Sequence, residues 1–218
     1  MLTFAIGDIH GHYDKLYRLL VKCKAYAGSA KYRLVFLGDY IDRGEDSRSV
    51  LELLKELHQS QSGQMDVICL LGNHEEMLIT SFDDPVISRE WLKNGGIETL
   101  DSYSDVGGMR LLEQHAAWLG GLPVQFDDGL RLFVHAGVNP STPLDAQTRS
   151  DLLWIREPFL SFEGKLDRLI VHGHTPARSG PEVRPHRVNL DTGAVYGGSL
   201  TSGIFNCYQA MPLGFLSV

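Results

Sequence analysis

The sequence has few of the features that mark membrane-bound proteins or disulfide-stabilised secreted proteins. Its three cysteines are widely separated and show no Cys-x-x-Cys spacing, which supports neither a disulfide framework nor a zinc ribbon. No apolar run approaches the roughly 20 residues that a membrane-spanning helix needs. The first residues show neither the basic region nor the long apolar region of a secretory signal. We therefore expect a cytoplasmic protein that does not contact the membrane.

Positive charge is also scarce in this chain. Lysine and arginine together number 20 against 27 aspartates and glutamates, the formal net charge is −7 at pH 7, and the basic residues form no cluster. A nucleic-acid partner is disfavoured, because binding a phosphate backbone needs a basic surface. A phosphorylated substrate would have to be attracted by positive charge at the site itself.

What the sequence does contain is an alternation of apolar, strand-like runs with amphipathic, helical stretches. The runs 2–6, 32–37 and 66–71 alternate with predicted helices over 14–24 and 47–58, which is the pattern of a parallel βαβαβ sheet. The next segment, 75–122, is predicted to be mainly helical, and we expect this insertion to cap the active face.

The second half of the chain is predicted to be mostly strand. Its runs predict a hairpin and then the strands of a second sheet packed against the first, so the expected fold is an α/β sandwich. The length of 218 residues and the hydrophobic content of 43% fit one domain over residues 1–218. The expected strands of this half cover 124–126, 130–134, 168–171, 183–190, 200–205 and 213–218.

Five short polar segments carry the chemistry of the sequence. Each follows a strand-like run and most are flanked by glycine, so their side chains can converge from irregular turns at one rim of a sheet. A single Asp-x-His pair is a weak signal, whereas five such segments in this order are a specific one. The segments are Gly7-Asp8-Ile9-His10-Gly11, Gly38-Asp39-Tyr40-Ile41-Asp42-Arg43-Gly44, Gly72-Asn73-His74-Glu75, His135-Ala136-Gly137 and Gly173-His174-Thr175.

The residue types in these segments predict a site for two metal ions. Asp8 and His10 lie two residues apart in an extended segment, so they point the same way and can hold one ion together. The two carboxylate oxygens of Asp39 can bridge both ions. Nitrogen and oxygen ligands without a thiolate suit Mn²⁺, iron or Zn²⁺, of which we expect Mn²⁺. The second ion would take an amide oxygen and two imidazoles, from Asn73, His135 and His174.

The same segments supply the groups needed to hydrolyse a phosphate ester. Two ions acidify a shared water, and the resulting hydroxide would attack the phosphorus in line, without a phosphoenzyme. The leaving alkoxide then needs a proton, which His74 is placed to give, while Asp42 can orient that imidazole and keep it protonated. Arg43 and Arg156 offer planar guanidinium groups that match phosphate oxygens. The prediction is a phosphomonoesterase that acts on phosphoproteins or small phosphorylated molecules.

The ordered segments resemble the signature of the PPP-type serine/threonine protein phosphatases within the calcineurin-like metallophosphoesterases, above all the short bacterial and bacteriophage lambda type. The resemblance runs from Ile6 to about Thr192 and extends to Trp91–Gly96 and Leu153–Glu157. It implies a metallophosphoesterase β-sandwich, with two mixed sheets flanked by helices and a helical cap insertion. It also implies hydrolysis of phosphoserine and phosphothreonine, with phosphotyrosine as a further candidate. The residues it implies are Asp8, His10 and Asp39 on the first metal, Asp39, Asn73, His135 and His174 on the second, His74 with Asp42 as the acid, and Arg43 and Arg156 on the phosphate.

Leu71 is an informative departure from the family pattern. Most members carry arginine before Gly-Asn-His-Glu, so one phosphate-binding arginine is absent here. The symmetrical diadenosine tetraphosphatases also lack it and share Gly-Asp-Ile-His-Gly and His-Ala-Gly, which makes them the alternative function. They resemble this chain less in having Asn-His-Asp in place of Asn73-His74-Glu75. A non-catalytic scaffold of the same fold is a third alternative, disfavoured because such scaffolds lose ligands that are present here.

The other histidines and the tryptophans receive minor roles. We interpret His12 as lying behind the ligands or in solvent. His172 would point to the same side as His174 in a regular strand and is the alternative ligand, but the motif favours His174. We assign no role and no partner to His58, His115 and His186. We expect packing roles, rather than stacking on a substrate, for Trp91, Trp118 and Trp154.

Overall fold

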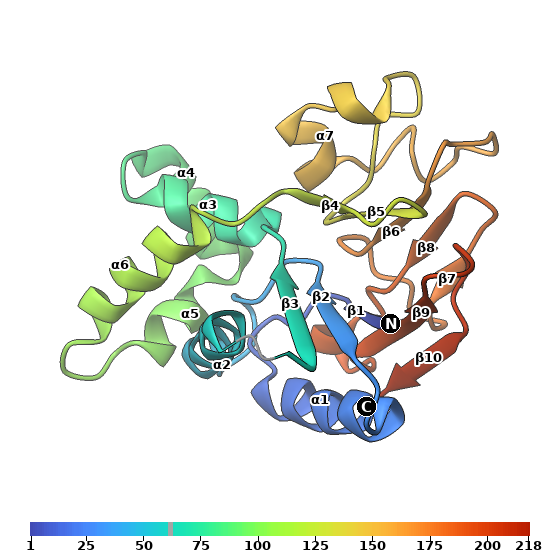
Figure 1. Ribbon diagram of the computed structural model, residues 1–218. Coiled ribbons are helices and arrows are strands. Elements are labelled where there is room, and N and C mark those ends of the chain that lie inside the picture. The colour runs from blue at the N-terminus through green and yellow to red at the C-terminus, as the bar shows by residue number, and fades with distance from the viewer. Residues whose placement is uncertain (61–62) are drawn as a thin grey trace.

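Two mixed five-stranded sheets face each other and form the centre of the molecule (Figure 1). The computed structural model describes residues 1–60 and 63–218. The strand order is β10-β9-β1-β2-β3 in the first sheet and β4-β5-β6-β8-β7 in the second. The predicted α/β sandwich of two mixed sheets is confirmed. The first sheet consists of β1 (Leu2–Ile6), β2 (Tyr32–Phe36), β3 (Met65–Cys69), β9 (Thr201–Asn206) and β10 (Gly214–Ser217), and the second of β4 (Gln125–Asp127), β5 (Arg131–Val134), β6 (Leu169–His172), β7 (Glu182–Val183) and β8 (Arg187–Asn189).

The first sheet is buried on both faces, which explains its nearly continuous apolar strands. Successive side chains of a strand point to opposite faces. In β1, Phe4 and Ile6 therefore join the core under the helices, whereas Ala5 joins the core between the two sheets. In β2 the same alternation places Phe36 on the helix side and Val35 between the sheets.

Helices α1 (Tyr13–Ala27) and α2 (Ser47–Gln59) connect the parallel strands β1, β2 and β3, as the sequence predicts. One face of α1 buries Leu16, Leu19 and Cys23 in the core under the helices. A shorter helix, α7 (Arg149–Trp154), lies on the side of the second sheet (Figure 1). No helix in residues 1–60 and 63–218 has the length and apolar character needed to cross a membrane.

The predicted helical insertion is observed over residues 73–119, beside β3 at one side of the first sheet (Figure 1). The predicted break at Trp91–Gly96 is a π-helical turn (Leu92–Gly96) in which Gly95 has φ 108°. A Cβ at Gly95 would lie 2.6 Å from the backbone nitrogen of Arg43, so both the backbone angle and the close contact require glycine. The insertion thereby touches the turn after β2. Its helices are α3 (Asn73–Ser81), α4 (Pro85–Trp91), α5 (Ile97–Ser102) and α6 (Gly108–Leu119).

The assignment of the last two strands to the second sheet is wrong. β9 pairs antiparallel with β1, with Ala5 opposite Gly203, and β10 pairs with β9, so both strands extend the first sheet. An apolar run indicates that a strand is buried, but it does not indicate which of two packed sheets contains the strand that pairs with it. The predicted strand 183–190 is likewise two strands, β7 and β8, which pair antiparallel.

His115 in α6 is buried, and its Nδ1 shares a hydrogen bond with the Tyr103 hydroxyl at 2.6 Å, so the expectation that it lacks a partner is wrong. Burial, followed by the charge of Lys55, lowers the pKa of His115 to about 4. A histidine in the unfolded chain titrates near pH 6.5, so from about pH 6.5 down to the folded pKa only the unfolded state gains this proton. The free energy of unfolding must therefore fall as the pH falls through this window.

We expect His115→Gln to lose less stability than the unmodified protein between about pH 7.5 and about pH 5, because the variant has no imidazole to protonate on unfolding. Urea unfolding at the two pH values measures the difference in unfolding free energy. An identical pH-dependent loss in both proteins would contradict the role assigned to His115.

Candidate active site

The turns that follow β1, β2, β3, β5 and β6 bring the predicted site residues together at one edge of the sheets. The carboxyl ends of parallel strands share an edge, and β1 to β3 and β5 to β6 are parallel pairs. Several site residues have positive φ although they are not glycine, a conformation that persists only where the surroundings hold it. These residues are His10 (46°), Asp39 (53°), Asp42 (73°), Arg43 (68°) and His174 (67°).

Asp39 lies between two groups of histidines. Its Oδ2 is 3.5 Å from Nε2 of His10 and 3.9 Å from Nε2 of His74. Its Oδ1 is 3.3 Å from Nε2 of His135, which belongs with His174 to the second group. His10, Asp39 and His74 form the first group, Asp39, His135 and His174 form the second, and each brings its ligand atoms close enough together to hold one metal ion. The carboxylate therefore has the position of a bridge. The predicted ligand Asp8 lies outside the first group, which instead contains His74, the predicted acid.

In two of the histidines the ring nitrogens are arranged so that Nε2, which faces Asp39, carries the lone pair. The Nδ1–H of His10 donates to the carbonyl of Ile41 at 2.8 Å, and that of His135 donates to the carbonyl of Leu37 at 2.9 Å. Because a carbonyl can only accept, Nε2 carries the lone pair in both rings. Burial lowers the pKa of His10 to about 3 and also lowers that of His135. Both imidazoles are neutral, which is the form that binds a metal.

Asn73 and His174 complete the second group. Oδ1 of Asn73 lies 2.7 Å from Nε2 of His135 and 3.0 Å from Nδ1 of His174, so an amide oxygen and two ring nitrogens converge on one point. Burial, together with the neighbouring His135, lowers the pKa of His174 to about 3. This is the amide and double-imidazole set that the sequence predicts.

The carboxylates of Asp8, Asp39 and Asp191 are buried close together. Asp8 accepts the backbone N–H of His174, with 3.0 Å to its Oδ2. Burial and the charges of Asp191 and Asp39 raise the pKa of Asp8 well above its usual value, and burial raises that of Asp191 to about 6. Buried negative charges need compensating positive charge. The cluster therefore fits metal cations, and Asp191 is a site residue that the motif analysis missed.

His74 and Asp42 form a buried pair, as predicted. The Nδ1–H of His74 donates to Oδ2 of Asp42 at 2.6 Å. Burial alone would lower the pKa of His74, but the carboxylates of Asp39 and Asp42 outweigh it and raise the pKa above its usual value. The pair therefore favours a protonated imidazole next to the Asp39 groups, which is the form of a general acid.

Trp91 is buried in the core, in agreement with the packing role expected for it, and it also holds this pair in place. Its indole N–H donates to both oxygens of Asp42, at 3.0 and 2.9 Å, and the Thr99 hydroxyl donates to Oδ1 at 2.7 Å. Both residues come from the helical insertion, at the end of α4 and within α5.

The two predicted phosphate-binding arginines differ in their surroundings. Arg43 donates from Nη1 to Nε2 of His10 and from Nη2 to Nε2 of His74, both at 2.8 Å, so it lies inside the cluster. Arg156 follows α7 and is exposed. Burial is the main cause that lowers the pKa of His135 and His174, and the positive charge of Arg156 is a further cause for both. Arg156 therefore lies beside the second group.

Glu75 supports the turn that carries Asp39, and the motif analysis gave it no role. Its carboxylate accepts the backbone N–H groups of Asp39 and Tyr40, both at 2.8 Å, and of Gly72 at 3.0 Å. A Cβ at Gly72 would lie 2.3 Å from the backbone nitrogen of Asp39, so this close approach needs glycine. These contacts join the turn after β2 to the start of α3.

The remaining histidines lie outside the two groups. Nδ1–H of His12 donates to the carbonyl of His10 at 2.7 Å, behind the ligands. His172 is buried with its ring 5.0 Å from that of Phe159 and belongs to neither group, so the structure favours His174. Two further histidines have neighbours where none was expected: Trp118 donates to His58 at 3.3 Å, and the ring of Phe162 lies 5.3 Å from His186.

Comparisons with known proteins agree on the family but differ in the activity they name. A model of the calcineurin-like phosphoesterase family matches residues 1–198. The chain is 31% identical to serine/threonine-protein phosphatase 1 of Salmonella typhimurium over 91% of this chain and 89% of that protein. It is 37% identical to the symmetrical bis(5'-nucleosyl)-tetraphosphatase of Photorhabdus laumondii over 66% of this chain and 47% of that protein. A crystal structure provisionally named a diadenosine tetraphosphatase shares the fold, with a TM-score of 0.70 at 23% identity, over 100% of this chain and 92% of that one.

The family match and the geometry support each other. The family implies a site for two metal ions, and the two buried groups that share Asp39 have the donor atoms and the negative charge that such a site requires. The family also implies phosphorylated substrates. The chain therefore belongs to the calcineurin-like phosphoesterases, metal-dependent enzymes that hydrolyse phosphate esters.

Proposed function

We propose that this enzyme removes phosphate from phosphoserine and phosphothreonine in proteins, with phosphotyrosine as a further substrate. The observation that carries the proposal is the 2.6 Å contact between His74 and Asp42, next to the Asp39 groups. The alkoxide of serine or threonine is a poor leaving group, so its departure gains most from a proton donor in this place. The Salmonella protein phosphatase, which the chain covers over 89% of its length, supports the same choice.

The proposal gives each site residue a role. When bound, two metal ions, which we propose to be Mn²⁺, supply an acidified water and positive charge at the phosphoryl oxygens. Arg43 and Arg156 bind those oxygens through their planar guanidinium groups. With Nδ1–H held by Asp42, His74 would carry the proton for the leaving oxygen on Nε2, a state in which this nitrogen no longer accepts the hydrogen bond from Arg43. Water attacks directly, without a phosphoenzyme. The ions would be held by Asp8, His10, Asp39, Asn73, His135 and His174.

Hydrolysis of diadenosine tetraphosphate is the second candidate, and Leu71 is the observation that favours it. Leu71 is buried, and its N–H donates to the carbonyl of Pro123 at 2.9 Å, so this position presents no cation to the site. The chain covers only 47% of the symmetrical tetraphosphatase, but it covers 87% of an asymmetrical bis(5'-nucleosyl)-tetraphosphatase at 27% identity, so length counts against the symmetrical enzyme and not against the activity itself. The intact acid pair also keeps the site suited to alkyl phosphates.

The test compares the two substrates on one preparation. Metal-stripped protein is reloaded with Mn²⁺, and kcat/KM is measured for a phosphoserine peptide and for diadenosine tetraphosphate, with p-nitrophenyl phosphate as a check that the protein is active. We expect a higher kcat/KM for the peptide and no turnover before reloading. A preference for the dinucleotide would move the proposal to the second candidate, and no turnover of any substrate would contradict catalysis.

A further inference from the structure

An exposed aromatic ring lies beside the site, close to two arginines. Tyr196 ends a 3₁₀ turn (Ala194–Tyr196) and is 53% exposed. The guanidinium carbon of Arg43 lies 5.9 Å from the centre of its ring, and that of Arg178 lies 5.6 Å from it. Both distances are those of cation–π contacts. The ring therefore links the proposed phosphate-binding arginine to a second cation.

The turn that carries Tyr196 is held from several sides. The ammonium group of Lys15 donates to the carbonyls of Ala194 and Gly198, both at 2.7 Å. The carboxylate of Asp191 accepts the backbone N–H of Gly193 at 3.0 Å. The Asp191 carbonyl accepts the N–H of Ala177, next to Arg178, at 2.8 Å. These contacts hold the turn that carries Tyr196 and the backbone next to Arg178.

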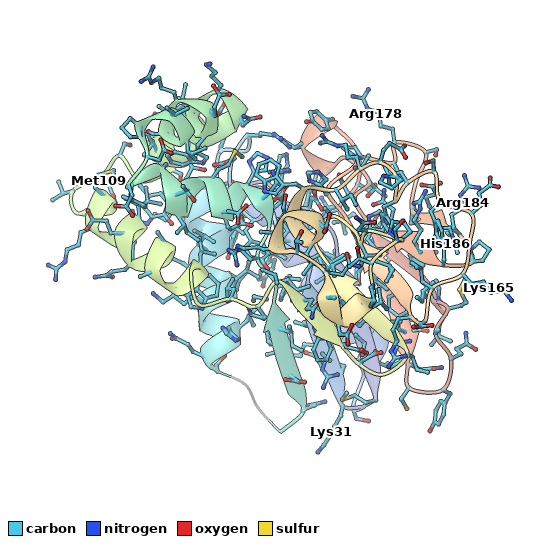
Figure 2. The ribbon with its side chains drawn as sticks, turned by 90° about the horizontal axis from the view of Figure 1, so that it is seen from above. Lys31, Met109, Lys165, Arg178, Arg184 and His186 are labelled. Atoms are coloured by element: carbon cyan, nitrogen blue, oxygen red, sulfur yellow. The ribbon has the colours of Figure 1, made fainter. Side chains whose placement is uncertain are left out.

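Neither guanidinium is neutralised by an ion pair. Within residues 1–60 and 63–218, Arg43 hydrogen-bonds to two imidazoles and Arg178 forms no ion pair with a carboxylate. By contrast, Arg184 and Arg187 both pair with Glu182, at 2.9 Å. Arg178 and Arg184 project outward at separate points of the surface (Figure 2). In a chain with a net charge of −7, Arg178, which forms no ion pair among the described residues, offers a place for anions.

We propose that Arg178, supported by Tyr196, binds a second anionic group of the substrate, namely an acidic side chain close to the phosphorylated residue of a peptide. This inference rests on the proposed protein phosphatase function. The ring lies at cation–π distance from two guanidinium groups, which supports a role in positioning cations. An acidic side chain would pair with Arg178 while the phosphate reaches Arg43.

The test uses two phosphoserine peptides of the same length, one with glutamate on both sides of the phosphoserine and one with glutamine. The ratio of their kcat/KM values is measured in the unmodified protein, in Arg178→Gln, in Tyr196→Leu and in the control Arg184→Gln. We expect a two- to five-fold preference, roughly, for the glutamate peptide in the unmodified protein and in the control. The preference should vanish in the other two variants and shrink as salt rises. Because each ratio is taken within one protein, a general loss of activity cancels.

Failure of this inference differs from failure of the proposed function. If the glutamine peptide is hydrolysed but the ratio is one, or if Arg184→Gln removes the preference as well, the Arg178 subsite is wrong and the phosphatase function stands. If no peptide is hydrolysed, the same ratio is read from inhibition constants against p-nitrophenyl phosphate, and equal constants overturn the subsite. If Arg178→Gln instead lowers kcat/KM for diadenosine tetraphosphate and leaves the peptide ratio unchanged, the subsite takes a nucleotide phosphate and the peptide proposal is overturned.

Discussion

Asp39→Asn is expected to abolish nearly all activity. The variant keeps the size of the side chain but removes the charge and one oxygen from the position between His10 and His135. Metal ions contribute several kcal/mol of charge stabilisation in the transition state. Weaker binding of both ions should therefore cost on the order of 10³-fold or more in kcat/KM. Metal content should fall below that of the unmodified protein. The measurements are kcat/KM and metal stoichiometry after dialysis.

Asp66→Asn is the matched control for this prediction. Asp66 pairs with Arg33 at 2.6 Å in the part of β3 that precedes the site end of the sheet. The same chemical change there should leave metal content intact. If Asp39→Asn keeps the metal content and the kcat/KM of the control, Asp39 is not the bridge that its position between two histidine groups indicates.

His74→Asn should reduce kcat on a phosphoserine peptide by on the order of 10² to 10⁴, because the leaving alkoxide loses its proton donor. The loss should be much smaller with p-nitrophenyl phosphate, whose phenolate leaves without help. Metal content should stay the same, since the proposed ligand set does not include His74. Initial rates on both substrates and metal analysis give the three values.

His58→Asn is the control for this variant, because His58 lies outside the two groups and its ring accepts a hydrogen bond from Trp118. It should leave the ratio of the two substrates unchanged. Equal losses on the alkyl and aryl substrates in His74→Asn would mean that His74 supports the site in some other way than as an acid.

The strand-end residues of the site could be predicted because they follow apolar runs in the sequence. Asp8, Asp39, Asn73, His135 and His174 each come directly after such a run, and parallel strands bring those positions to a shared edge. The structure places them together, while their assignment as metal ligands remains a prediction. The interpretation of the chain as one domain also remains a prediction.

The residues that the sequence did not reveal act across long separations. Trp91 and Thr99 reach Asp42 from a different helix, and Asp191 joins Asp8 from the turn after β8. No local pattern marks such contacts, because each depends on how the insertion and the two sheets pack. The misplaced strands β9 and β10 have the same origin: their burial could be read from the sequence, but their partner could not.

The central claim is that two metal ions lie on either side of Asp39. The most direct measurement is an anomalous difference map from crystals grown with Mn²⁺ and recorded at the manganese absorption edge. We expect two peaks, one near Asp8, His10 and Asp39, and one near Asp39, Asn73, His135 and His174. A single peak, or peaks that do not contact Asp39, would contradict the proposed two-metal site.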